Sequence, residues 1–417
     1  MGRLANQLFF VCLLTAALVA CQRSGGNPAD LASPVSATAA VAAAAPPTAV
    51  PSPTLSPAAT FTPIPTPSDT PAGTAAPTPI PTPTETPTLA PAPLVFLTAA
   101  DFSPDRSPFT GEIATEPSNL LRRPIAIKIS NSPAEWVRPQ SGLSQADLVF
   151  EHYAEGATRF TAVFHSQTPP KLGPIRSARL IDLELPAMYN AAFAFSGAHV
   201  YTEQQLRESD FRARLIWSFE DGYYRTGEEK PWEHTLYAET AALWRRLDIK
   251  GQNAPPQLAN VMPFDQRPLP GGDPAFRIEI GYYLTVVEYR FDPETGRFWR
   301  WADGEPHLDA NNGEQLSAAN VVVVVVEHEM VEDVCVYAQG GECQVNPMLI
   351  KLWGEGEAFL FRDGREYPAR WQRRGRHDML TLVRPDGVSL PFQLGNTWFQ
   401  ILPAGSTLAG YVVWDSE

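Results

Sequence analysis

Two acids, one arginine and one histidine fall close together in the chain: Glu151, Glu155, Arg159 and His165. Alternation along two strands predicts that they share one face of a β-hairpin. The apolar face would be formed by Leu148, Phe150, Phe160, Ala162 and Phe164. Two carboxylates across a cleft are the groups that a hydrolase or transferase uses as general acid and base. A wall-acting hydrolase or transferase is therefore one candidate function, with Glu151, Glu155 and His165 as the catalytic candidates.

A group of arginines indicates a second kind of chemistry. Arg176 and Arg179 follow a Gly-Pro turn at the predicted start of a helix, a position that attracts anions. Guanidinium groups add bidentate donors for a carboxylate or a phosphate. With Arg138 and Arg159, they predict a site for an anionic ligand. A structural role also fits the sequence, because neighbouring carboxylates can pair with the same arginines.

A mixed α/β unit must position these residues. Its predicted strands cover residues 125–130, 148–153 and 159–165, the last two as an antiparallel hairpin. Its predicted helices cover residues 177–192 and 238–247. The later part of the chain is expected to be mostly β. Its predicted strands cover residues 276–280, 285–291, 297–301, 321–326, 358–361, 367–373 and 398–402. The fold class expected from this pattern is α+β, in two units.

The second unit is rich in aromatic residues, which suit either a β core or a sugar-stacking face. The residues concerned are Phe298, Trp299, Trp301, Trp353, Trp371 and Trp398. The core is the commoner fate of such side chains.

The N-terminus predicts export. A short apolar run after Arg3 is too short for a stable membrane span and has the form of a signal peptide. It ends in Leu-Val-Ala followed by Cys21, the pattern of a bacterial lipobox, so cleavage is expected after residue 20 and a lipid on Cys21. An ordinary signal peptide beside an accidental cysteine is the alternative. The expected location is the cell membrane, on its extracytoplasmic face.

Composition divides the rest of the chain. Residues 21–94 are dominated by Pro, Ala, Thr and Ser, which predicts a disordered, proline-rich stalk. A second cluster of Pro and Gly near residues 251–273 marks a boundary. The predicted folded domains are therefore residues 95–255 and 274–417.

Two cysteines remain after removal of the signal peptide and lipidation of Cys21. Cys335 and Cys343 flank a Gly-Gly pair, and in an oxidising compartment they predict a disulfide. A catalytic thiol is the alternative, although neither cysteine has a local motif for one.

Charge and motifs exclude several function classes. The formal net charge of −14 disfavours nucleic acid and anionic membrane surfaces as partners. Nucleophile, P-loop and Rossmann motifs are absent, so no cofactor is expected. Histidines with acids nearby occur at His307 and His328, but their spacing does not form a metal motif, and no metal site is expected.

Several unusual strings, in order, resemble the YerB-like lipoprotein family. They are Arg123–Ile129, Arg138–Leu143, Thr158–Phe160, Gly173–Arg179, Pro231–Tyr237, Gly304–Asp309, Asn320–Val323, Gly354–Gly356 and Gly395–Trp398. The resemblance covers nearly everything after the stalk and implies two α+β units on a lipoprotein. The sequence differs from the family pattern at Glu233, which precedes His234 where a proline is expected, and in the turn around His199. Because the family is defined by domains of unknown function, the resemblance implies no catalytic residue.

The leading hypothesis is a membrane-tethered binding or assembly module that recognises an anionic wall component or an envelope protein. The competing hypotheses are the wall-acting enzyme and a mechanical spacer.

Overall fold

The computed structural model describes residues 97, 99–405 and 410–416, which lie in one compact unit. The predicted signal peptide, Cys21 and the whole of the predicted stalk lie outside the described residues. Within the described part of the chain, no helix is long and apolar enough to cross a membrane.

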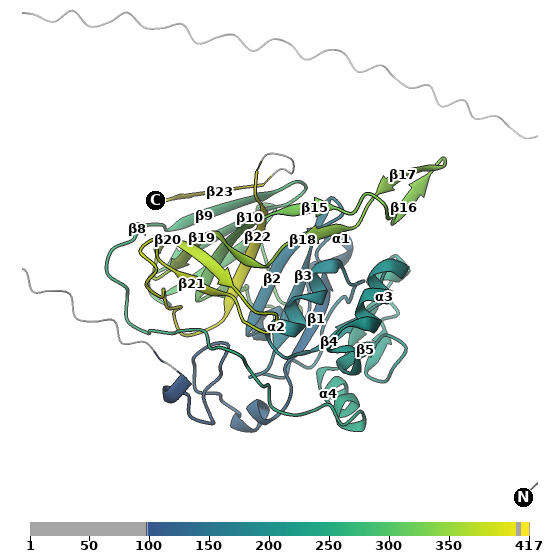
Figure 1. Ribbon diagram of the computed structural model, residues 1–417, viewed down its shortest axis with the longest axis horizontal. Coiled ribbons are helices and arrows are strands. Elements are labelled where there is room, and N and C mark those ends of the chain that lie inside the picture. Colours follow the sequence, from purple (N-terminus) through teal and green to yellow (C-terminus); the bar gives the residue numbers. More distant parts are fainter. Residues whose placement is uncertain (1–96, 98, 406–409, 417) are drawn as a thin grey trace, which may run out of the picture. The chain divides into compact units, whose positions relative to one another are not determined.

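An eleven-stranded sheet forms the centre of this unit (Figure 1). The first half of the chain contributes β1 (Ile125–Ser130), β2 (Leu148–Ala154), β3 (Ala157–Phe164), β4 (Ala192–Phe195) and β5 (Leu215–Trp217). The second half contributes β8 (Asp273–Pro274), β14 (Asn320–Val326), β19 (Gly354–Arg362), β20 (Arg365–Arg373), β21 (Thr381–Val383) and β22 (Thr397–Pro403). The order is β21-β20-β19-β14-β22-β2-β3-β1-β4-β5, with β8 on β20. The two halves meet where β22 runs parallel to β2.

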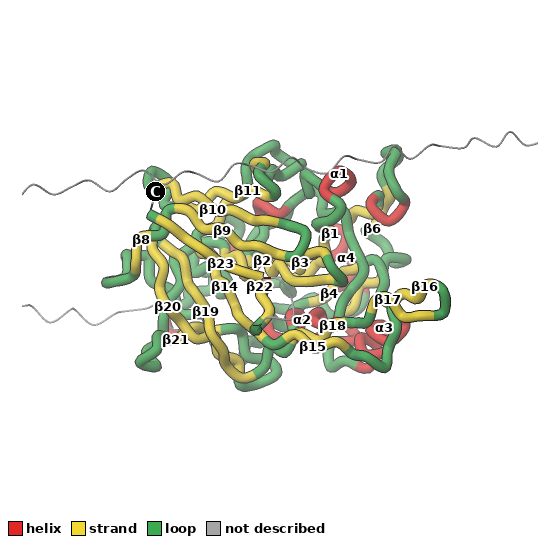
Figure 2. The backbone as a smooth tube through the Cα atoms, turned by 90° about the horizontal axis from the view of Figure 1, so that it is seen from above, coloured by secondary structure: helices red, strands yellow, loops and turns green. Residues whose placement is uncertain are grey.

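A six-stranded antiparallel sheet covers one face of this main sheet, as Figure 2 shows for β9, β10 and β11. Its strands are β9 (Arg277–Tyr282), β10 (Val286–Asp292), β11 (Arg297–Ala302), β12 (Glu305–Pro306), β13 (Ser317–Ala318) and β23 (Gly410–Asp415). Arg300 of β11 and Tyr289 of β10 pack on Trp398 of β22. All seven strands predicted in the second half are present, which confirms its mostly β character.

The other face of the main sheet is covered by short helical segments. Tyr189, directly after α2, packs on Phe150 of β2 with ring centroids 5.7 Å apart. The helices of the described residues, not all of which lie on this face, are α1 (Ala134–Val137), α2 (Leu185–Met188), α3 (Val200–Glu208) and α4 (Thr240–Ile249). The 3₁₀ helices are Ala99–Asp101, Pro117–Leu121, Leu143–Gln145, Leu180–Leu183, Arg212–Arg214 and Trp232–His234.

The long helix predicted over residues 177–192 is wrong. A 3₁₀ turn and α2 occupy this stretch, and β4 begins at Ala192. Pro186 has no backbone N–H with which to continue a helix from the preceding turn, and Asn190 has a positive φ of 48° that ends α2.

Three two-stranded pairs complete the fold. They are β6 (Tyr223–Arg225) with β7 (Leu236–Ala238), β15 (His328–Met330) with β18 (Met348–Ile350), and β16 (Tyr337–Gln339) with β17 (Glu342–Val345). A disulfide between Cys335 and Cys343 closes the β16–β17 hairpin, which confirms the predicted pairing.

Candidate functional site

The hairpin β2–β3 fixes which polar residues meet. Its turn consists of Glu155 and Gly156, with φ of 51° and 85°, as in a type I′ turn. Glu151 is paired with Phe160, and His152 with Arg159. Paired residues point to the same side of a sheet, so Glu151 and Arg159 point to opposite sides.

The predicted shared face for Glu151 and Arg159 is therefore wrong. The prediction placed Phe150 and Phe160 on a single apolar face and the polar residues on the other. Both phenylalanines are fully buried, but on opposite sides, because the main sheet is covered on both faces. In such a sheet both faces of each strand carry apolar residues, so alternation does not reveal which face of one strand lies on the same side of the sheet as which face of the next.

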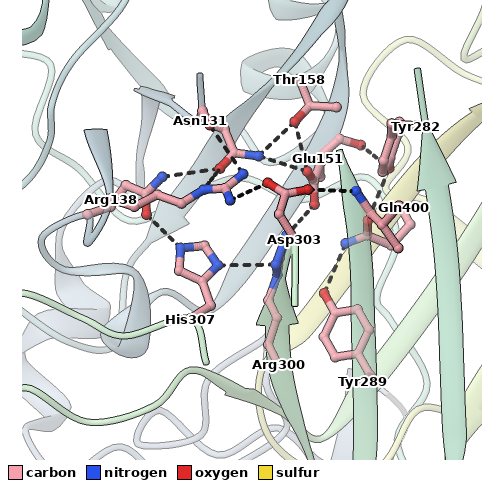
Figure 3. Close-up of polar contacts among 12 residues, drawn as sticks. Asn131, Arg138, Glu151, Thr158, Tyr282, Tyr289, Arg300, Asp303, His307 and Gln400 are labelled. Atoms are coloured by element: carbon pink, nitrogen blue, oxygen red, sulfur yellow. Dashed lines mark hydrogen bonds and ion pairs between the residues drawn. The ribbon is translucent and has the colours of Figure 1, made fainter. Parts of the chain in front are cut away.

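On one side of the hairpin, Glu151 belongs to a buried polar network (Figure 3). We call this network closed because each charged side chain in it has a partner, although the Nε of Arg300 makes no hydrogen bond within the described residues. It forms an ion pair with Arg300 at 2.6 Å, and both side chains are fully buried. Glu151 also accepts hydrogen bonds from Asn131 (3.0 Å) and Thr158 (2.9 Å). Arg300 donates to His307 Nδ1, so Nε2 of this histidine carries the proton that it donates to Gln140 at 2.6 Å.

Arg138 lies at the rim of this closed network. It donates to Asn131 and forms an ion pair of 2.5 Å with Asp303, as Figure 3 shows. The expectation that it would meet the other three arginines is therefore wrong: it lies with Glu151 and His307, on the opposite side of the hairpin.

His165 is separate from both groups. Its backbone N–H donates to Asp147, its Nε2 lies 3.1 Å from the carbonyl oxygen of Arg122, and burial lowers its pKa to about 4. It follows the end of β3 that is remote from the turn. The predicted constellation of Glu151, Glu155, Arg159 and His165 is not assembled, because its members lie on two faces and at both ends of the hairpin.

The other side of the hairpin has a buried polar base. The ammonium group of Lys128 donates to His152 (2.6 Å), Thr161 (3.0 Å) and Asp182 (3.0 Å). The Nδ1–H of His152 donates to the carbonyl of Tyr153, so its Nε2 is the acceptor for Lys128. Burial lowers the pKa of Lys128 to about 8, against the attraction of Asp182. All three donors of the ammonium are used.

Three arginines lie above this base: Arg159, Arg176 and Arg179. We call them the arginine cluster. Arg159 Nη1 donates to the carbonyl of Ser177 at 2.7 Å, and Arg179 pairs with Glu155. Burial and then the charge of Arg179 lower the pKa of Arg159 to about 9. Positive charges that are held this close together and partly removed from water repel one another, and this favours the binding of an anion between them.

Arg176 has spare hydrogen-bonding capacity. Its guanidinium makes no hydrogen bond or ion pair with any residue that the structure describes, and its Nε is buried. Beside it lies His234, a residue only 2% exposed, whose Nδ1 also lacks a partner among the described residues. Burial, followed by the charge of Arg176, lowers the pKa of His234. The guanidinium of Arg176 thus remains available to a ligand, and the Nδ1 of His234 is an unsatisfied group buried beside it.

The local fold explains the position of the cluster. The backbone of Arg176 donates to Lys128 near the end of β1, and Ala178 donates to Gly197, just after β4. β1, β4 and β5 run parallel, so their carboxyl ends lie at one edge of the sheet, where α3 begins. Crevices outside the carboxyl ends of parallel strands are the usual ligand sites of such sheets.

The arginines are recognisable in the sequence, but the lysine base beneath them is not among the predicted site residues. A lysine among the isoleucines of β1 was the available signal, because a charged residue in a buried strand requires a partner. Its partners come from three other segments, and their spacing in the chain does not indicate the contact. Within the described residues, no three His, Cys, Asp or Glu side chains gather as a metal site.

The fold and the site define a three-layered α+β protein with a basic site at the carboxyl ends of its parallel strands. The chain belongs to the DUF3048 family, described as proteins of unknown function. The model of the family's N-terminal domain matches residues 109–253, and that of its C-terminal domain matches residues 278–399.

Two comparisons with Bacillus subtilis agree with this assignment. The chain is 30% identical over 312 residues to the "Putative lipoprotein YerB" of strain 168, covering 72% of this chain and 86% of the relative. The crystal structure of the YerB protein superposes with a TM-score of 0.62 at 27% identity, covering 74% of this chain and 99% of that one. The resemblance inferred from the sequence strings is confirmed.

Proposed function

We propose that this protein is a lipid-anchored binding module of the cell envelope that recognises an anionic ligand with Arg159, Arg176 and Arg179. The lipid is carried by Cys21 and holds the protein at the extracytoplasmic face of the membrane. The ligand presents a carboxylate or a phosphate, as the peptides and anionic polymers of a cell wall do.

The observation that carries this proposal is the unpartnered guanidinium of Arg176 within the cluster. Its Nε is buried without a hydrogen bond, and the carboxylate of Glu233, which attracts it, lies beyond ion-pair distance, so a bidentate anion would satisfy the guanidinium directly. Arg159 and Arg179 already bind backbone carbonyls through Nη1, which holds them in place. The cluster is therefore positioned before a ligand arrives, which lowers the entropic cost of binding.

The wall-acting enzyme is less well supported. A paired-carboxylate mechanism needs acids that can exchange protons with a substrate. Glu151 is fully buried and bound to Arg300, Asn131 and Thr158, and Glu155 is paired with Arg179. Neither carboxylate is free for this task.

The test is binding of the detergent-solubilised full chain to isolated cell walls and, by calorimetry, to inorganic phosphate and acetate. We expect Arg176→Ala to weaken binding about tenfold or more. Arg176→Lys should have a smaller effect, because lysine keeps the positive charge but lacks the bidentate N–H donors of the guanidinium. Arg245→Ala, which removes a surface arginine paired with Glu239, is the matched control and should bind normally. Unchanged retention of the triple variant of the cluster on walls would refute the proposal.

The anchor is tested separately. Cys21→Ser should release the protein into the medium and move it from the detergent phase to the aqueous phase in a Triton X-114 partition. Continued membrane association of this variant would disprove the lipid anchor while leaving the ligand site untouched.

A further inference from the structure

A cavity of about 610 Å³ opens on the outer side of the six-stranded sheet, away from the arginine cluster. Its lining residues are Ser144, Trp299, Trp301, Glu314, Gln315 and Ser317. This volume lies within the range of small-molecule sites. Ser144 comes from the first half of the chain and is held to the second half by a hydrogen bond of 2.7 Å to Asp309. The cavity is thus a built feature of the joined fold.

Two tryptophans on one strand dominate this cavity. Along β11, Phe298, Arg300 and Ala302 point inward and are buried, while Trp299 and Trp301 point outward and stay partly exposed. Of the other aromatics of this half, Trp371 and Trp398 fill the core. Residues two apart on a strand are separated by about 6.8 Å, so the two indoles form a ledge on the scale of one or two sugar rings.

Both indoles are held in place before any ligand arrives. The Trp299 Nε1–H donates to Asp292 at 3.3 Å. The guanidinium of Arg290, which is not part of the cavity lining, lies 4.2 Å from the ring centre of Trp301. A fixed aromatic ledge loses little conformational entropy on binding.

The polar lining consists mainly of spare acceptors. Gln315 uses its Nε2 for the carbonyl of Arg300 at 2.8 Å, and its Oε1 has no partner among the described residues. One oxygen of Glu314 accepts from Asn312, and the other is likewise free within that part of the chain. Acceptors suit the hydroxyl donors of a sugar, and the carboxylate of Glu314 disfavours an anion.

We propose that this cavity binds a neutral glycan chain, with its sugar rings stacked on Trp299 and Trp301 and its hydroxyl groups donating to Glu314 and Gln315. The combination of an aromatic ledge with carboxylate and amide acceptors fits the two kinds of surface of a sugar ring: apolar faces and a polar edge. The site does not use the arginine cluster, so the two proposals stand or fall independently.

The test titrates the detergent-solubilised full chain with chitotetraose, cellotetraose and maltotetraose, followed by tryptophan fluorescence and calorimetry. We expect at least one of these glycans to bind, and Trp299→Ala and Trp301→Ala each to raise its Kd about tenfold or more. Trp301→Phe should retain most of the affinity, since a smaller ring still stacks. Glu314→Ala should weaken binding several-fold, and Glu314 is exposed, so this variant should fold normally.

Trp353→Ala is the matched control. Trp353 is also partly exposed and also lies beneath an arginine, Arg373, at 4.2 Å, but it does not line the cavity. It should bind glycan like the unchanged protein, and so should Arg176→Ala. Absence of binding to all three glycans at millimolar concentration would overturn the proposal. Equal affinities for the unchanged protein, Trp299→Ala and Glu314→Ala would overturn it too, as would an equal loss in Trp353→Ala.

Discussion

The two sides of the β2–β3 hairpin carry similar residues in opposite states. On the side of Glu151, a carboxylate, an arginine and a histidine are buried together, and Arg300 and His307 are bound to partners. On the side of Arg159, the lysine base is just as well satisfied, but Arg176 and His234 above it have spare hydrogen-bonding groups. A charged residue in a strand therefore does not by itself indicate function.

What separates the two sides is what covers them. The Glu151 side lies under the six-stranded sheet of the second half, which supplies Arg300 and His307. The Arg159 side lies at the carboxyl ends of β1, β4 and β5, where loops, the start of α3 and the 3₁₀ turns that carry Asp182 and His234 approach. Closed networks hold folds together, whereas incompletely satisfied ones mark candidate functional positions.

The largest effect is expected from breaking the closed network. Glu151→Ala leaves the buried charge of Arg300 without its partner and should lower the free energy of unfolding by about 3–5 kcal/mol. Urea denaturation monitored by circular dichroism measures this. The double variant Glu151→Leu with Arg300→Met should recover much of the loss, because it removes both charges. A loss below about 1 kcal/mol in Glu151→Ala would mean that the network is not closed.

Each side of the hairpin contains a buried, neutral histidine, which should make the protein less stable at acid pH. Burial, with Arg300 beside His307 and Lys128 beside His152, holds the pKa of each well below its usual value. Below about pH 6.5 the unfolded chain takes up protons that the folded chain refuses, so stability falls as pH falls, by about 1.4 kcal/mol per pH unit for each histidine.

His307→Gln and His152→Gln should each flatten the dependence of stability on pH between about pH 6.5 and 5. Thermal melting across this range measures the slope. An unchanged slope in both variants would show that neither histidine resists protonation.

The smallest effects should separate Arg138 from Arg176. Arg138→Ala removes hydrogen bonds to Asn131 and the ion pair with Asp303, and should cost about 1–2 kcal/mol. Arg176→Ala removes no hydrogen bond within the described residues. It loses the attraction of Glu233 but also relieves the repulsion from Arg179, so stability should change by less than about 0.5 kcal/mol. Denaturation curves of the two variants, recorded under the same conditions, test this difference. Equal losses of unfolding free energy would contradict the distinction between the two sides.

Local pattern was enough to predict much of this molecule. Alternation and turn residues located the strands of the second half, and the Cys335–Cys343 spacing gave the disulfide. The six-valine run of β14 is buried except for the partly buried Val325, because strands flank it and both faces are covered, as its continuous apolar character indicates. The loop containing Arg176 and Arg179 was also recognised as a site of interest.

Long-range pairing was not predictable. No local signal indicates that Glu151 meets Arg300, or that Asp182 meets Lys128, because these partners are set by the stacking of whole elements. Arg138 was misplaced for the same reason: its neighbour Asp303 lies in the second half of the chain. The hairpin faces were misassigned because a sheet covered on both sides has two apolar faces.

The parallel pairing of β22 with β2 also has a consequence for biosynthesis. β22, the strand next to β2 in the centre of the sheet, begins only at Thr397 and is therefore synthesised long after β2, which ends at Ala154. Until it arrives, the growing polypeptide must keep an unpaired apolar strand edge from associating with other chains, a state that is prone to aggregation. A nascent chain stalled before residue 397 would lack the middle of its sheet rather than its margin, and should depend on chaperones or be degraded.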